Sequence, residues 1–435
     1  MPSGRFYTAN TKQRRLATEE LINNTTKRRK YQDNIEQFIT QLNTEKRPDV
    51  LLKEVFEKIK QAAEDSVGYK SNRSNNYTYH DSKLREMSEQ QRDIRLRIEN
   101  CGMETKKELK NKRNRLLHEI RDRGRLLWMK YLDDKVTEIE RLPPGNQIFM
   151  ATRLLNRGSR NTKISVWDES EHMILDDEDK ASRIADHFKR QFQTDDTYTP
   201  TFIGHPRGLL NEITPSEVLE AFHRMNNNRP AGYDGVPGEL LKYAPNSLAS
   251  FFAHILNKAF AQHCPLPIGT GIIIPVQKPG KRRGPCGSLR PVVLVTSLRK
   301  TLSTIVRSRI SRSVDRYLSC SQSGFRPGKS TVDIVWTHRW INAICQKYKR
   351  SFHVLGIDMS KAFDSINRSK LLIVLKNIID EDSLRMIHML LSETQLFVRI
   401  GPKESRLFPA NVGTPQGDTL SPILFVTGFI AHRVG

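Results

Sequence analysis

The spacing of apolar residues changes at about residue 270, and this change constrains the fold more than any other feature. Before it, residues 10–145 carry apolar positions three and four apart among alternating charges, which is typical of amphipathic helices. After it, β-branched or apolar runs at 271–276, 291–296 and 353–357 predict strands, and 302–318 predicts a helix. A further strand pair is expected at 396–400 and 407–412. The sequence therefore predicts an α+β fold preceded by a mainly α-helical N-terminal region.

Proline and glycine divide the chain into segments. A break at 100–102 is expected to fold the helical region into a hairpin, and Leu142-Pro143-Pro144-Gly145 ends it. Thr214-Pro215-Ser216-Glu217 combines a capping residue, proline at the first helical position and glutamate two residues later, which predicts a helix start. We expect a helical region at 1–145, a connector at 146–205 with a linker at 193–206, an extension at 206–257 and an α+β domain at 258–435.

Positive charge is concentrated in one part of the sequence. The formal net charge is +23, and residues 251–350 hold 18 Lys and Arg but only 2 Asp and Glu. Such a field attracts a polyanion and supports salt-sensitive phosphate binding. A basic protein without a polyanionic partner is the alternative, and two acids in a hundred residues argue against it.

Other sequence features indicate where in the cell the protein acts. No apolar run approaches the roughly 18 residues of a membrane span, and the polar, basic N-terminus does not resemble a secretion signal. The five cysteines are scattered, which favours a reduced, intracellular protein without a zinc knuckle. Lys27-Arg28-Arg29-Lys30 is either a nuclear-localisation patch or a solvated helix face.

Asp358 is the first candidate for chemistry. It ends the apolar run 354–357, so a strand there would place its carboxylate at a sheet edge beside a cleft. Hard cations that assist phosphoryl transfer are held by such oxygen ligands. The alternative is that Asp358 only caps the next helix. Asp364, six residues on, is expected to orient the loop or cap a helix.

Two further features accompany Asp358. Residues 413–422 form a glycine- and proline-rich turn before an apolar helix, and within it Gln416 offers both a donor and an acceptor. Upstream, Lys278 and Arg290 lie near the ends of two predicted strands. Cations in that position suit a triphosphate clamp.

In order and spacing, five segments resemble the reverse transcriptases of non-LTR retrotransposons, with group II intron and telomerase enzymes as more distant relatives. The resemblance covers about residues 226–435. The segments are 229–237, similar to the family's N-terminal extension motif; the region of Lys278 and Arg290, similar to the fingers; 321–331, similar to the block along the template; 354–364, similar to motif A; and 413–422, similar to motif B.

The resemblance implies a fold and a set of roles. The fold would be the fingers and palm of a right-hand polymerase, with an RNA template, a DNA primer and deoxynucleoside triphosphates as partners. Asp358 would be the catalytic, metal-binding aspartate, with Mg²⁺ as cofactor, and Phe363 the aromatic gate against a ribose 2′-hydroxyl. The remaining assignments are nucleotide contacts at Arg290, Lys278, Gln416 and Gly417, and template contacts at Gly324, Phe325, Arg326, Gly232 and Asp234.

The sequence departs from the family pattern in one respect. The second aspartate pair, in motif C, does not occur between motif B and Gly435. Two-metal transfer needs carboxylates from both motifs. We therefore expect an incomplete palm and an inactive polymerase fragment, from a truncated gene model or a decayed copy. The alternative function is that of a non-catalytic RNA-binding protein derived from a retroelement.

Overall fold

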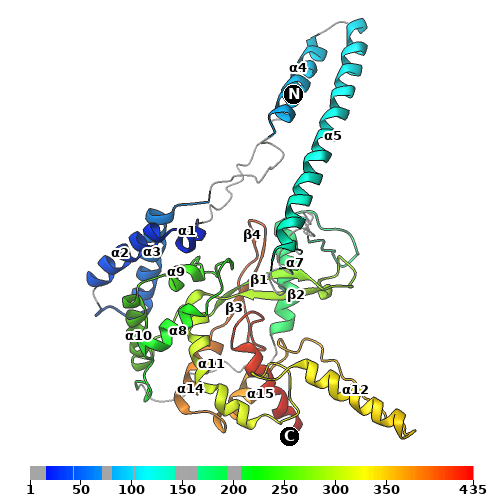
Figure 1. Cartoon of the computed structure of the whole chain (residues 1–435). Helices are drawn as coiled ribbons and strands as arrows, with labels where there is room; N and C mark the ends of the chain where they lie inside the picture. Colours follow the sequence, from blue (N-terminus) through cyan, green and yellow to red (C-terminus); the bar gives the residue numbers. More distant parts are fainter. Residues whose placement is uncertain are drawn as a thin grey trace. The chain divides into compact units, whose positions relative to one another are not determined.

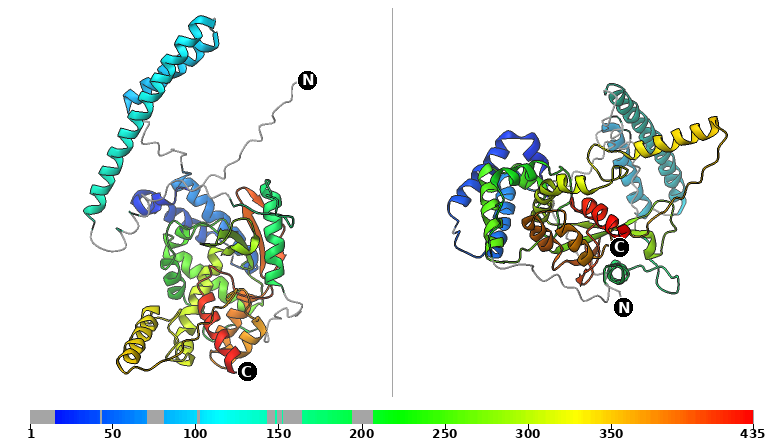
Figure 2. Two further views of the ribbon diagram at one scale, coloured as in Figure 1. Left: turned by 90° about the vertical axis from the view of Figure 1, so that its right-hand side faces the viewer. Right: turned by 90° about the horizontal axis from the view of Figure 1, so that it is seen from below.

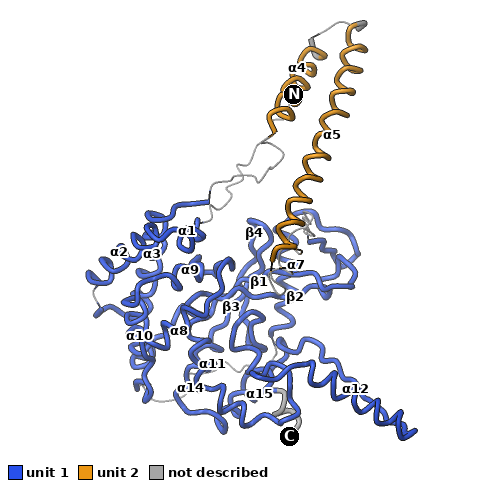
Figure 3. Tube along the Cα trace, viewed as in Figure 1, with its two compact units in different colours: residues 1–70, 164–435 blue, residues 71–163 orange. Residues whose placement is uncertain are grey.

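The structure is a computed structural model that describes residues 16–42, 44–70, 81–100, 103–142, 148, 152, 164–193 and 207–434. The chain divides into two compact units (Figure 3). One comprises residues 1–70 and 164–435, and the other comprises residues 71–163. Of the predicted linker at 193–206, all but Gln193 lies outside the described residues, and the predicted domain boundaries stay predictions.

The second unit is a helical hairpin. Helix α4 (Ser82–Asn100) packs against α5 (Met103–Glu140), and the break between them falls where the sequence predicted it. Asp81 precedes α4 and accepts a hydrogen bond at 2.6 Å from Arg123 of α5. On α5 beyond that contact, Trp128 and Met129 are exposed.

The first unit contains a core built from helices (Figure 1). Thr214 and Glu217 form the predicted reciprocal cap of α8. Tyr31 donates to the Leu240 carbonyl at 2.7 Å, which joins the N-terminal helices to the segment before residue 258. The helices of this core are α1 (Glu19–Asn23), α2 (Thr25–Thr40), α3 (Pro48–Val67), α8 (Pro215–His223), α9 (Gly238–Lys242), α10 (Asn246–Ala261), α11 (Ser297–Tyr317), α13 (Arg368–Lys376), α14 (Glu381–Leu391) and α15 (Ser421–Val434).

The described residues include one mixed sheet in the order β2-β1-β3-β4, with β5 also paired to β3. The hairpin of β1 and β2 is antiparallel, whereas β1 and β3 run parallel. The predicted strands at 271–276 and 291–296 and the pair at 396–412 are present, with shifted ends. The strands are β1 (Thr270–Gln277), β2 (Leu289–Leu294), β3 (Gln395–Ile400), β4 (Lys403–Glu404) and β5 (Phe408–Pro409).

Helix α7 (Asp177–Phe192) covers one face of this sheet. Ile184, Phe188 and Phe192 are buried against sheet residues such as Val293 and Val398. The end of the helix is also tied to the chain beyond β5, because the amides of Asn411 and Val412 donate to the Phe192 carbonyl at 3.0 and 3.2 Å. Burial and backbone hydrogen bonding therefore fix the C-terminal end of α7.

The predicted strand at 353–357 is wrong. This segment has no regular secondary structure, and Leu355 and Ile357 are 86% and 76% exposed. A strand is stable only when a neighbour satisfies its backbone groups, and none of the five described strands pairs with this one. The preceding helix α12 (Thr331–Lys347) has no buried residue and projects from the rest of its unit (Figures 1 and 2).

Two predictions about where the protein acts in the cell, the lack of a membrane span and the nuclear-localisation patch, concern described residues. Across the part of the chain that the structure describes, no helix combines the length and apolarity needed to cross a membrane. The basic run on α2 is partly engaged: Arg28 donates to the carbonyls of Leu21 and Ile22, and Lys30 to that of Asp65. A nuclear signal there stays a prediction.

Candidate functional site

The turn at 413–418 packs closely against neighbouring backbone. The backbone amides of Gly413 and Thr414 donate to the backbone carbonyls of Ile366 and Phe363 at 2.8 and 2.9 Å. The backbone carbonyl of Gln416 accepts from the Val293 amide of β2 at 2.7 Å. A Cβ on Gly413 would lie 2.8 Å from backbone atoms of Asp364. Its φ of +77° also favours glycine. The glycine content of the turn thus permits close backbone approach.

Two buried arginines anchor this turn. Arg368 donates to the carbonyls of Gly413, Leu391 and Ala410 at 2.6–2.9 Å. Burial lowers its pKa to about 9, so the guanidinium still carries its charge at neutral pH. Arg299 of α11 pairs with Asp418 at 2.8 Å, with both side chains 2% exposed. The turn is therefore fixed from two sides by buried polar groups.

Asp364 lies at the centre of the candidate site. Its two carboxylate oxygens accept from Gln416 Nε2 at 2.8 and 2.9 Å, and one of them also accepts from Gln191 Nε2 at 2.7 Å. The residue is only 3% exposed. Burial raises the pKa of Asp364 to about 6, against the opposing effect of both glutamines and of Lys361 and Lys278. The sequence left open whether Asp364 orients this loop or caps a helix, and these bonds favour the first alternative.

An aromatic cluster lies next to Asp364. The Phe363 ring is 5.7 Å from Phe325 and 5.0 Å from Phe425 of α15, measured between centroids. Phe325 is 58% exposed and has a φ of +59°. The structure thus brings the predicted gate residue and a predicted template residue together, although 38 positions separate them in the sequence.

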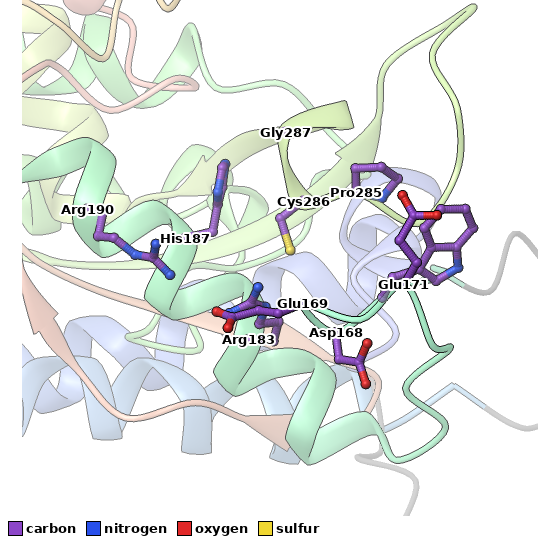
Figure 4. A pocket seen from close by; sticks show the side chains of 10 residues that line it. Asp168, Glu169, Glu171, Arg183, His187, Arg190, Pro285, Cys286 and Gly287 are labelled. Carbon is purple, nitrogen blue, oxygen red and sulfur yellow. The ribbon is translucent and has the colours of Figure 1, made fainter.

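Helix α7 also contributes basic side chains to a pocket. Arg183, His187 and Arg190 line a pocket of about 290 Å³ together with Cys286 and Gly287 (Figure 4). Burial lowers the pKa of His187, and so do Lys361, Arg190, Lys278 and Arg183 around it. Lys278 also contacts a residue that lines this pocket, because its Nζ donates to the Gly287 carbonyl at 2.8 Å.

The far end of this pocket is acidic and internally paired. Arg183 forms an ion pair with Glu169 at 2.9 Å, and Arg282 lies over the Trp167 ring at 4.4 Å and 3.7 Å from Glu171. The pocket is therefore not a uniformly cationic site. His187 and Arg190 lie at the end of the pocket away from Glu171, as the close-up in Figure 4 shows.

The other predicted nucleotide contacts lie on β2 and the turn. Arg290 is exposed and pairs in register with Val276 across the hairpin. Gly417 is exposed and packs against the Val293 carbonyl, which a Cβ would approach to 2.5 Å. Both residues are accessible to a ligand, and their roles stay predictions.

The predicted template contacts fall into two groups. Arg326, next to Gly324 and Phe325, pairs with Asp315 at 2.5 Å and thereby ties this loop to α11. Asp234 is half-buried and accepts from the Ser297 amide at 2.7 Å, and desolvation of its carboxyl group raises its pKa.

Gly232 lies against the same end of α11. A Cβ at this position would be 2.4 Å from the Val295 carbonyl oxygen. Gly232 and Asp234 therefore have structural roles at the start of α11, and their template contacts stay predictions.

Asp358 is an exposed carboxylate in the unpaired segment before the aromatic cluster. Among the described residues, no group of three His, Cys, Asp or Glu side chains is placed to hold a metal ion. These residues therefore do not fit a complete metal centre. Asp358 is available as one oxygen ligand.

Sequence reasoning missed Gln191, His187, Lys361 and Phe425. Gln191 and His187 lie 173 and 177 residues before Asp364, on a helix that the sequence analysis did not predict. Phe425 belongs to an apolar helix and was indistinguishable from core. The basic residue Lys361 stands inside the motif A segment, where it could have been noted.

The site can now be compared with known proteins. Residues 276–429 match the family model described as reverse transcriptase (RNA-dependent DNA polymerase). This range contains Lys278, Arg290, Phe363, Asp364 and Gln416. Helix α7, which contributes Gln191, lies outside it.

Curated relatives carry similar descriptions. The chain is 26% identical over 328 residues to a probable RNA-directed DNA polymerase from transposon BS of Drosophila melanogaster, covering 72% of this chain and 36% of that protein. It is 26% identical over 177 residues to a retrovirus-related Pol polyprotein from type-1 retrotransposable element R1 of Bradysia coprophila, covering 39% and 17%.

A third relative is an uncharacterized 149 kDa protein of transposon TX1 from Xenopus laevis, 26% identical over 165 residues and matched over 38% of this chain and 12% of its own length. The chain thus spans about a third of the Drosophila relative and less of the other two. Residues 276–429 therefore match a reverse transcriptase domain, and the chain is similar to the reverse transcriptases of non-LTR retrotransposons.

Proposed function

We propose that this chain forms the fingers and the first part of the palm of an RNA-directed DNA polymerase. It would hold an RNA template with a DNA primer and select the incoming deoxynucleoside triphosphate. The observation that carries this proposal is the meeting of three sequence-distant segments at one place. Phe325, Phe363 and Gln416 come from these segments, and Asp364 links the last two through its contacts.

Each side chain has a chemical role in this proposal. The half-buried Phe363 ring is supported by Phe425, so it can exclude a 2′-hydroxyl by volume without yielding. Gln416 offers its side-chain amide oxygen to the sugar or base, because its side-chain NH₂ group donates to Asp364. Lys278 and the exposed Arg290 would neutralise the triphosphate.

Reverse transcriptases use divalent metal ions, and we propose Mg²⁺ here. Carboxylate and phosphate oxygens are its preferred ligands, and the ion would neutralise charge on the transferring phosphate. Asp358 would supply one of these ligands and the bound nucleotide others. We likewise propose that the protein acts inside the cell, in the nucleus.

The template surface follows from exposed charge. Within residues 251–350, cations that pair with acids, such as Arg299 and Arg309, are the minority. The exposed ones can bind phosphates of an RNA–DNA hybrid, and such binding weakens steeply with salt. The exposed cations are Lys281, Arg282, Arg283, Arg290, Arg307, Arg312, Arg316, Lys329, Arg339, Lys347, Lys349 and Arg350.

A ternary-complex assay tests the proposal. The chain is titrated against a labelled RNA template annealed to a dideoxy-terminated DNA primer, with Mg²⁺ and either the complementary or a non-complementary deoxynucleoside triphosphate. We expect the complementary nucleotide to tighten binding about tenfold, or 1.4 kcal/mol. Gln416→Ala should abolish this gain, and Gln346→Ala on the exposed α12 is the matched control.

A second function, RNA binding without chemistry, is favoured by the exposed cations and by the lack of an assembled metal centre among the described residues. It predicts salt-dependent RNA binding with the same affinity for either nucleotide. Primer extension adds a second discriminator. Incorporation that disappears in Asp358→Ala would exclude the binding-only function.

A further inference from the structure

The C-terminal end of α7 reaches the nucleotide site from outside the family-matched range. Gln191, in the last turn of the helix, donates to Asp364 Oδ2 at 2.7 Å, and the same carboxylate accepts from Gln416 at 2.8 and 2.9 Å. These three side chains come from segments separated by 173 and 52 positions. The link is buried at Asp364, which is 3% exposed.

We propose that Gln191 is a positioning residue for the incoming nucleotide: through Asp364 it holds the Gln416 amide with its NH₂ group inward and its carbonyl oxygen free for the substrate. This inference rests on the proposed function of the turn. It extends the nucleotide site to a helix that lies before the reverse transcriptase domain in sequence.

The direction of the amide follows from hydrogen-bond chemistry. An ionised carboxylate only accepts hydrogen bonds, so Gln416 must turn its NH₂ group, and not its oxygen, toward Asp364. A second donor, Gln191, stops the Asp364 carboxylate from rotating away. Because charged acceptors form stronger bonds than neutral ones, the two glutamines together fix one arrangement.

Gln191 is suited to this role because its helix is immobilised on both sides of it. Phe188 and Phe192 are 1% and 2% exposed in the sheet core. The Phe192 carbonyl accepts from the amides of Asn411 and Val412, which lead directly into the turn. The donor and the turn are thus built on the same rigid support.

Protonation provides a readout of the arrangement. Protonated Asp364 gains a donor O–H, which competes with the two NH₂ groups and permits the Gln416 amide to turn over. The charged groups that act on Asp364 are Lys361 and Lys278, and both lysines also act on His187, together with Arg190 and Arg183. Gln191 itself lowers the pKa of Asp364, so its removal should raise that pKa further.

Nucleotide affinity against pH tests the inference. The dissociation constant of the complementary nucleotide is measured in the ternary complex from pH 5.5 to 8.5 for the full chain. Gln191→Leu should weaken it about fivefold at pH 7.5, the effect of roughly one hydrogen bond. The midpoint of the pH dependence, expected near the Asp364 pKa of about 6, should move upward.

Two further variants separate positioning from mere stability. Gln191→Glu puts two carboxylates together, so nucleotide binding should be poor at pH 8 and recover toward pH 6, where a shared proton restores a donor. Gln193→Leu is the matched control, since it removes a hydrogen bond from the same helix end to the Pro409 carbonyl without touching Asp364. Its nucleotide affinity and pH midpoint should stay at wild-type values.

The inference is overturned if Gln191→Leu binds the complementary nucleotide as tightly as the wild type does. It is also overturned if Gln193→Leu loses as much nucleotide affinity as Gln191→Leu. Absence of a complementary-nucleotide effect in the wild type would instead contradict the proposed function. In that case, hydrogen exchange of the Thr414 backbone amide, which donates to the Phe363 carbonyl, tests the contact between Gln191 and Asp364 without any nucleotide. Faster exchange in Gln191→Leu than in Gln193→Leu supports the link, and equal exchange excludes it.

Discussion

Two segments of this chain that resemble polymerase motifs differ sharply in how they are built. The turn at 413–418 is fixed by Arg368, by the Arg299–Asp418 pair and by backbone bonds to neighbouring segments. The segment at 351–361, which holds Asp358, has no strand pairing and is mostly exposed. The turn is therefore preorganised by buried contacts, whereas the segment with Asp358 has few such contacts, and we expect it to gain order only when ligands or partners bind.

The largest expected effect comes from breaking the buried ion pair below the turn. Asp418→Ala leaves Arg299 charged and buried without its partner. Such a change costs about 3–5 kcal/mol of the free energy of unfolding. Urea denaturation of wild type and variant measures it. A loss below about 1 kcal/mol would mean that the turn is not anchored by this pair.

Next in size is the removal of the second anchor. Arg368→Leu deprives the carbonyls of Gly413, Leu391 and Ala410 of their donor, and burial keeps water from replacing it. We expect a loss of about 2–4 kcal/mol, since each unsatisfied buried group costs free energy. Thermal denaturation gives the value. An unchanged melting temperature would contradict the role assigned to Arg368.

The pH dependence of stability sharpens the comparison at Asp364. Its folded-state pKa of about 6 exceeds the ordinary value of 3.8, so the folded protein takes up this proton first. The free energy of unfolding should therefore fall as pH rises from about 4 to 6 and change little above, by roughly 2–3 kcal/mol relative to Asp364→Asn. Denaturation of both proteins at pH 4, 5, 6 and 7 measures this difference. Parallel pH curves would show that the carboxyl is not perturbed.

The smallest effect on stability is expected at Asp358. Asp358→Ala should change the free energy of unfolding by no more than about 0.5 kcal/mol, as for other exposed positions. The same variant should lose the Mg²⁺-dependent gain in nucleotide binding. A large destabilisation would place Asp358 in the core instead of at an open ligand position.

Local patterns predicted local structure well. The capping box at Thr214, the strands β1 and β2 and the break before α5 depend on neighbouring residues, and all of them are present. The motif resemblance also placed Phe363 and Gln416 in one site. In each of these cases the information lies within a short stretch or in a family pattern.

Long-range pairing could not be predicted in the same way. An apolar run at 353–357 has strand propensity, but a strand also needs a partner, which the run itself does not specify. The contact of Gln191 with Asp364 depends on how α7 lies across the sheet. No periodicity in the sequence encodes that placement.

Hydrogen exchange of the two segments tests the central comparison most directly. Amides of the 413–418 turn and of residues 351–361 are followed in the free chain and in the complex with RNA–DNA hybrid, Mg²⁺ and complementary nucleotide. We predict slow exchange in the turn in both states, and fast exchange at 351–361 that slows in the complex. Fast exchange at 351–361 in both states, or a turn that is protected only in the complex, would contradict this account.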